Sequence, residues 1–342
     1  MLRLASALLI SAFSLNAFAA DDAWLALQKT AYAARELNYQ GVFVYQNGKQ
    51  TRSVQITHMN NNGQEMTRNL VLNTNLRAGQ PREVYSQGSD IVIVHPKNET
   101  KNTTNNTSNN TSNNTSTMVI EKRRGQNLFP AMLPTDLQAL KASYSIRALA
   151  TEMIAGRGAQ VFELTSNDAY RYNYKIWADA EFGLLLKMTL LDSKKQTLEQ
   201  IEFTELSMLN SRDVNWFQPK IDVKKQYVTE DSNTINHVDT NWIVAELPTG
   251  YVKVDHVTLN LPGKAAPVDQ MIFSDGIASV SLFIEPVAKG TRPKMGHMLI
   301  GSTNICANVI DGYQITVVGE VPEATVMQIA KAVTFKKQTA LK

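Results

Sequence analysis

The sequence contains little cysteine, no marked excess of charge of either sign, and no apolar run long enough to span a membrane. Cys306 is the one cysteine among 342 residues, so no disulfide can form within the chain. Lysine and arginine number 34 against 31 acidic residues, which excludes the strongly basic surface typical of nucleic-acid-binding proteins. Stability must therefore come from burial of apolar side chains, and a hydrophobic content of 43% is ordinary for a globular protein.

Cys306 itself lies between Ile305 and Ala307, and this apolar setting favours a buried small side chain over a reactive thiol. An intermolecular disulfide stays open as an alternative.

The amino terminus is typical of a secretory signal peptide. Arg3 is followed by an apolar run from Leu4 to Leu15 and by the small-residue triplet that ends at Ala19. The run is shorter than the roughly 20 residues that a membrane-spanning helix needs. We therefore predict cleavage after Ala19 and an exported, soluble mature chain.

No pattern typical of catalysis or metal binding is present. The sequence has no Gly-x-Ser-x-Gly elbow, no Cys-x-x-Cys pair and no phosphate-binding loop. The histidines are dispersed along the chain, and none stands at a spacing that places two ligands on one helix face. They are His58, His95, His237, His256 and His297. The sequence therefore predicts a protein that is not an enzyme and uses no cofactor or metal.

The first half of the chain predicts one helix followed by an antiparallel sheet. Apolar residues recur at helical spacing over 24–37, with Asp21 and Asp22 placed to cap the helix. Short β-type runs separated by turn residues then follow between 41 and 94. Residues 98–117 are almost wholly Asn, Thr and Ser, so we expect a mobile loop there.

A second group of strands begins near Tyr144. Within it, alternation over 170–176 places Tyr170, Tyr172, Tyr174 and Ile176 on one predicted face. A polar, charged stretch at 211–235 then predicts a linker between a large domain, 20–210, and a small domain, 236–342. The small domain combines strands with a final helix after Pro322, so the fold class is mainly β, or α+β.

Several segments together resemble the RseB/MucB family, and their order and joint spacing carry the resemblance. In the large domain they are GQPREV at 79–84, YNYKIWAD at 172–179, LLLKMTLLD at 184–192 and TLEQ at 197–200. In the small domain they are Trp242, LPTGY at 247–251, FSDG at 273–276 and ITVVGEVP at 315–322. The Asn/Thr/Ser-rich insert has no counterpart in the family pattern.

The resemblance implies a fold, a location and a function. It implies a large unclosed antiparallel β-barrel with covering helices, similar to lipoprotein carriers, followed by a small α+β domain. Family members are periplasmic proteins that bind the periplasmic part of a transmembrane anti-sigma factor and shield it from site-one proteolysis. Lipid or lipopolysaccharide fragments would release the complex. The expected function is thus negative regulation of an envelope-stress sigma factor, with no nucleic-acid partner.

Two sets of residues are candidates for these contacts. Aromatic and apolar side chains of the large domain either line a lipid cleft or form plain core; they are Tyr172, Tyr174, Trp177, Leu186 and Met188. In the small domain, Trp242, Tyr251 and Phe283 are candidates for anchoring the partner, with burial in the core as the alternative.

Two other functions compete with this hypothesis. A soluble periplasmic carrier of lipid or lipoprotein would use the same half-barrel, without a dedicated partner surface on the small domain. A periplasmic hydrolase would require polar residues that converge in the cleft. The sequence leaves open whether the chain forms a homo-oligomer.

Overall fold

The computed structural model describes residues 20–72, 82–88, 90–96, 117–124, 128–222, 225–231, 234–236, 241–259, 264 and 266–335. The predicted signal peptide and the Asn/Thr/Ser-rich insert up to residue 116 lie outside them. Within the described residues, no helix combines the length and the apolar character needed to cross a membrane.

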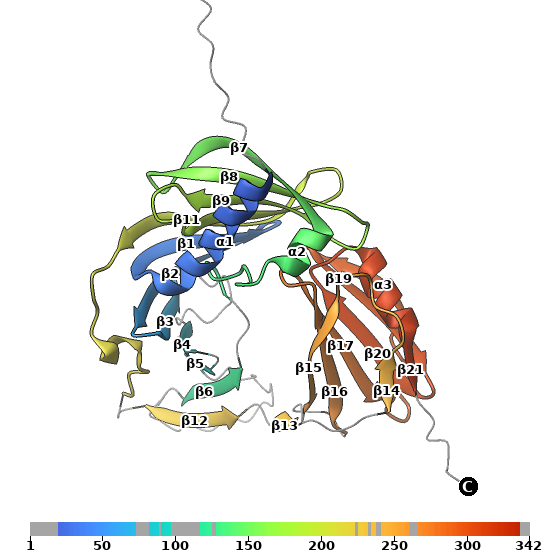
Figure 1. Cartoon of the computed structure of the whole chain (residues 1–342). Helices are drawn as coiled ribbons and strands as arrows, with labels where there is room; N and C mark the ends of the chain where they lie inside the picture. Colours follow the sequence, from blue (N-terminus) through green and yellow to red (C-terminus); the bar gives the residue numbers. More distant parts are fainter. Residues whose placement is uncertain are drawn as a thin grey trace, which may run out of the picture.

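A single curved sheet of twelve strands forms the large domain (Figure 1). The strands are β1 (Tyr39–Asn47), β2 (Gln50–Asn61), β3 (Gln64–Val71), β4 (Arg82–Gln87), β5 (Asp90–Pro96), β6 (Thr117–Arg124), β7 (Tyr144–Ile154), β8 (Arg157–Ser166), β9 (Asn173–Asp179), β10 (Leu185–Leu191), β11 (Thr197–Met208) and β12 (Gln226–Asp231). Their order in space is β12-β6-β5-β4-β3-β2-β1-β11-β10-β9-β8-β7. The end strands β12 and β7 do not pair with each other, so the predicted unclosed barrel is confirmed.

Helix α1 (Ala20–Glu36) packs across this sheet and contacts β2, β7 and β10. Its small and apolar side chains at Ala23, Leu27 and Ala34 are buried against the sheet, as the helical spacing predicts. Phe43, Phe129 and Phe203 form a group of mutually packed rings in the same core. The main core of the large domain therefore lies between α1 and the sheet, and two smaller apolar clusters lie apart from it.

The strand predicted from Tyr170 begins three residues later than expected. β9 starts at Asn173, whereas Tyr170 and Arg171 lie in the preceding turn. Tyr174 and Ile176 do point into the core. Alternation alone missed the boundary because Arg171 takes part in long-range contacts that hold the turn out of the sheet.

Among the described residues of the segment predicted as a linker, 211–235, two complete elements lie, and the strand β13 (Thr234–Asn236) begins at its end. The 3₁₀ helix η1 (Val214–Phe217) places Phe217 against Met59 and Met66. β12 runs parallel to β6 and extends the large sheet. Only part of this segment therefore connects the two sheets, because its few apolar side chains find partners on the large domain.

The small domain is a sheet of seven strands covered by one helix (Figure 1). The strands are β13 (Thr234–Asn236), β15 (Val252–Leu259), β16 (Val268–Ser274), β17 (Ser279–Pro286), β18 (Gly296–Ile300), β19 (Thr303–Ile310) and β20 (Tyr313–Gly319). Helix α3 (Glu323–Ala332) follows Pro322 and buries Val326 and Ile329. β14 (Trp242–Val244) and β21 (Val333–Phe335) form a separate two-stranded pair. The predicted α+β character of this domain is confirmed.

We predict that Leu27→Ala lowers the free energy of unfolding by about 2–5 kcal/mol, because the Leu27 side chain of α1 is fully buried against the sheet. Leu25→Ala is the matched control, since Leu25 lies on the same helix but is 67% exposed. Urea denaturation of both variants measures the difference. Equal losses would show that the described packing of α1 is incorrect.

Candidate ligand cavity and domain junction

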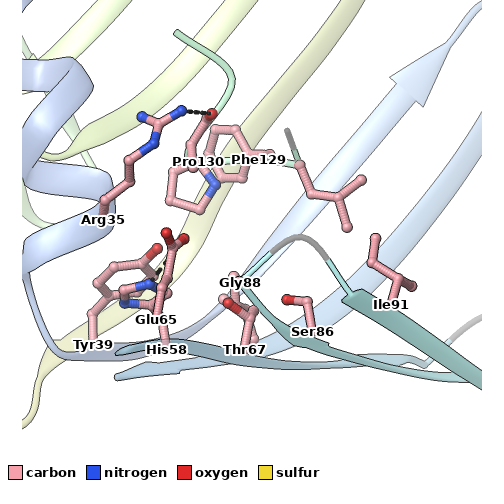
Figure 2. Close-up of a pocket in the computed structure, with 13 residues that line it drawn as sticks. Arg35, Tyr39, His58, Glu65, Thr67, Ser86, Gly88, Ile91, Phe129 and Pro130 are labelled. Carbon is pink, nitrogen blue, oxygen red and sulfur yellow. Dashed lines mark hydrogen bonds and ion pairs between the residues drawn. The ribbon is translucent and has the colours of Figure 1, made fainter. Parts of the chain in front are cut away.

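A cavity of about 330 Å³ lies in the large domain, on the face of the sheet that the segment 128–131 covers (Figure 2). Its floor includes a row of residues that are direct partners across five neighbouring strands: Tyr39, His58, Thr67, Ser86 and Ile91. Cross-strand partners share one face of a sheet. The register of β1 to β5 therefore brings these side chains to one site from distant parts of the sequence.

His58 is the buried polar centre of this row. Its ring stacks on Tyr39 with centroids 4.7 Å apart, and its Nδ1 lies 2.7 Å from the carbonyl oxygen of Leu37. Because a carbonyl only accepts, Nδ1 carries the proton. Nε2 has no hydrogen-bond partner and lies 3.4 Å from Oε1 of Glu65.

The roof of the cavity is apolar and is tied to α1. Leu128, Phe129 and Pro130 cover the row. Nη2 of Arg35 donates to the carbonyl oxygen of Ala131 at 3.0 Å, a bond visible in Figure 2. The guanidinium thus fixes the roof from outside the row.

The chemistry of the cavity suits a molecule with both an apolar part and a hydrogen-bond donor. The Glu65 carboxylate and Nε2 of His58 are both acceptors in the neutral-histidine form. A primary amine has enough N–H groups to donate to both acceptors, whereas a hydroxyl group, with one hydrogen, can donate to only one of them. Volumes of about 300 Å³ and above are typical of small-ligand sites.

A second site, the domain junction, is built around Arg171. Its side chain is fully buried, and its Nε donates to Oδ2 of Asp275 at 2.8 Å across the two domains. Nη1 donates to Asp168 of the same turn, and Nη2 donates to the carbonyl of Thr249. The guanidinium also lies over the ring of Tyr251, 4.9 Å from its centroid.

The backbone around this ion pair is shaped to fit it. Gly250 has φ +83°, and an added Cβ would lie only 2.8 Å from Nη2 of Arg171. Both oxygens of Asp275 are used, because Oδ1 accepts from the amides of Ile277 and Ala278. A buried charge is tolerated when it is paired and hydrogen-bonded in this way.

The carbonyl of Tyr170 adds further bonds between the domains. It accepts from Oγ1 of Thr325 at 2.7 Å and from the hydroxyl of Tyr251 at 3.3 Å. Burial raises the pKa of Tyr251 well above its ordinary value, and the charge of Asp275 raises it further. The hydroxyl therefore keeps its proton and stays a donor.

The turn between β18 and β19 makes the second contact with the large domain. Ser302 donates to Oε1 of Glu199, which also accepts from Asn47 and Tyr45. Nδ2 of Asn304 donates to the hydroxyl of Tyr172 at 3.0 Å. Two separate groups of polar contacts thus hold the small domain in place.

The structure places the five lipid-cleft candidates around the core of the large domain. Tyr174, Trp177, Leu186 and Met188 are buried, and Tyr172 is half-buried at the junction. None of the five lines the cavity of Figure 2. Their role in lipid binding stays a prediction.

The three partner-binding candidates differ in exposure. Trp242 and Tyr251 are buried, the first in the small-domain core and the second at the junction, while Phe283 is half-buried. None presents a large exposed surface in this structure, and their contact with a partner stays a prediction.

Sequence reasoning did not single out His58, Glu65, Arg171 or Asp275. Only the resemblance drew attention to FSDG at 273–276, which includes Asp275. A charged residue inside an aromatic alternation was the available signal for Arg171. No sequence pattern pointed to His58, because its neighbours Tyr39 and Thr67 reach it through the register of separate strands.

The structure thus defines a two-domain β protein, with a buried ion pair joining the domains and a cavity in the large one. The chain belongs to the MucB/RseB family. The family's N-terminal domain model matches residues 22–225, and its C-terminal domain model matches residues 236–334.

Curated relatives and solved structures agree with this assignment. The sigma-E factor regulatory protein RseB of Escherichia coli K12 is 24% identical over 324 residues, which cover 94% of each chain. The sigma factor AlgU regulatory protein MucB of Pseudomonas aeruginosa is 29% identical over 203 residues, 58% of this chain and 63% of that one. The structure of the P. aeruginosa MucA/MucB complex matches with a TM-score of 0.69 and 26% identity, covering 92% of this chain and 99% of that one.

We predict that Arg171→Ala lowers the free energy of unfolding by about 3–5 kcal/mol, because it leaves the carboxylate of Asp275 buried without its cation. Calorimetry should also show that the domains unfold in separate transitions. Arg147→Ala is the control, since Arg147 is largely exposed and pairs only within the large domain. A single, unshifted transition in Arg171→Ala would contradict the junction described above.

Proposed function

We propose that this protein is a periplasmic negative regulator of an envelope-stress sigma factor. It binds the periplasmic part of a transmembrane anti-sigma factor and shields that part from site-one proteolysis. It works by binding and performs no catalysis. The signal-peptide pattern at residues 1–19 supports export to the periplasm.

The observation that carries this proposal is the match of both family domains, in order, to the chain. The structures of the relative MucB include one described as a complex with MucA(peri), which matches with a TM-score of 0.67 and covers 92% of this chain. A carrier would need only the large domain, whereas here the small domain is kept and tied to the large one by buried contacts.

We further propose that a lipid or lipopolysaccharide fragment is the release signal and that it enters the cavity of the large domain. The apolar roof at Phe129 and Pro130 suits an acyl segment. The acceptors at His58 and Glu65 suit an amine or hydroxyl on the head group.

We predict that the full-length protein binds the purified periplasmic part of its anti-sigma factor and slows its cleavage by the site-one protease until binding saturates. Titration calorimetry and a cleavage time course measure the two effects. A protein that binds lipid but not this partner would be a carrier, and the regulatory proposal would fail.

We predict that Ser86→Trp weakens binding of a fluorescent amine-headed lipid analogue while the fold is retained, because an indole at Ser86 fills much of the cavity. Ser207→Trp is the matched control, since Ser207 is exposed and lies outside the lining. If the lipid lowers the affinity of the unmodified protein for its partner, the partner must lower the affinity for the lipid by the same factor. Unchanged lipid affinity in Ser86→Trp would exclude this cavity as the lipid site.

A further inference from the structure

Strand β18 is the exposed edge of the small-domain sheet. Among the described residues it pairs only with β19, which lies beside α3 in Figure 1, and it ends the strand order of that sheet. Every residue of β18 is exposed, and so are the five residues before it. Exposed edge strands present unpaired backbone groups and are usually protected by charge, by proline or by a covering element.

Three side chains of β18 are apolar, whereas an exposed edge strand usually carries charged residues or proline that prevent pairing. Met298, Leu299 and Ile300 are 52%, 58% and 58% exposed, and Met295 just before the strand is 73% exposed. Successive residues of a strand point to opposite faces. The strand therefore exposes apolar side chains on both faces, which a packed interior would not explain.

In the large sheet, by contrast, the end strand β7 is partly covered. β7 is also an end strand, yet Ile146, Ala148 and Leu149 pack against the core and α1 contacts it. Only Met153 is a large exposed apolar side chain there. β18 has no such cover among the described residues.

The register identifies which backbone groups of β18 point away from β19. Gly301 and Ser302 form a two-residue turn, so Ile300 and Thr303 are the hydrogen-bonded pair that closes it. Hydrogen-bonded and non-hydrogen-bonded pairs alternate along an antiparallel hairpin, so Leu299 and His297 form no backbone hydrogen bonds with β19. Their N–H and C=O groups point to the open edge.

Positive charge adjoins this edge. Lys289, Arg292 and Lys294 precede β18, are exposed, and form no ion pair among the described residues. The carboxylate of Glu323 lies 3.5 Å from Nδ1 of His297 on the strand. The local field therefore favours an acidic ligand.

The same hairpin touches the domain junction. Its turn residue Ser302 bonds to Glu199, and Asn304 of β19 bonds to Tyr172. A ligand that pairs with β18 would therefore lie next to the contacts that hold the two domains together.

We propose that β18 binds an extended segment as an eighth strand of the small-domain sheet, and that the segment combines apolar with acidic residues. This inference rests on the proposed function, because it assigns the segment to the periplasmic part of the anti-sigma factor. Main-chain hydrogen bonds supply affinity in such strand addition, and the flanking side chains supply selectivity.

Leu299→Pro tests the backbone contact directly. Proline removes the outward N–H of residue 299 and leaves the hydrogen bonds between β18 and β19 intact, a position that edge strands tolerate. Affinity for the purified periplasmic part of the anti-sigma factor, measured by titration calorimetry with the full-length protein, should fall about tenfold or more. Leu299→Ala is the matched control that removes the side chain but keeps the N–H, and its loss should be smaller.

Each outcome has a distinct meaning. If the unmodified protein does not bind the partner, the proposed function fails, and this inference fails with it. If Leu299→Pro keeps its melting temperature and binds as tightly as the unmodified protein, only the strand-addition proposal is overturned. If it instead dissociates a dimer of the unmodified protein without changing partner affinity, the occupant is a second copy of this chain, which also overturns the proposal.

The charge requirement has its own test. Replacing Arg292 and Lys294 together by Gln should weaken partner binding roughly fivefold at low salt. The difference should shrink as salt screens the exposed charges. Equal affinity at low salt would contradict the acidic character assigned to the segment.

Discussion

The arrangement of this molecule depends on the buried guanidinium of Arg171. A desolvated cation must have its donors satisfied, and here the acceptors come from both domains. Asp168 belongs to its own turn, whereas Asp275 and the carbonyl of Thr249 belong to the small domain. Moving the small domain away would leave a charge buried without its partner, or expose it to water together with the ring of Tyr251. These hydrogen bonds and the ion pair therefore help to fix the relative position of the two sheets.

Strand β1 connects the cavity to the turn between β18 and β19. It begins at Tyr39, which stacks on His58 in the cavity, and ends at Asn47, which bonds to Ser302 at the β18–β19 turn. The same strand thus contacts a candidate ligand site at one end and the small domain at the other. This geometry gives a direct physical connection between a ligand in the large domain and a partner on the small one. If the two binding events are coupled through this strand, the coupling acts reciprocally on the two affinities.

The strands and helices were largely predictable because their patterns are local. Helical spacing identified the buried face of α1, and alternating residues bounded by turn signals identified most strands. The start of β9 was wrong by three residues, since the contacts of Arg171 with Asp275 and Thr249 come from far along the chain. The element η1 was missed because four residues are too few to show a period, and β12 was missed because its sequence is mostly polar.

By itself, the sequence determined the class of fold, the division into a large and a small domain, and, through the resemblance, the family. These follow from periodicity and from the order of short segments, which are properties of neighbouring residues. Only the tertiary structure decided where the sites lie. The cavity row requires the register of β1 to β5, the junction requires Arg171 to meet Asp275 across 104 positions, and the free edge requires β18 to be last in its sheet. Strand order and register are set by long-range pairing, and no local pattern encodes them.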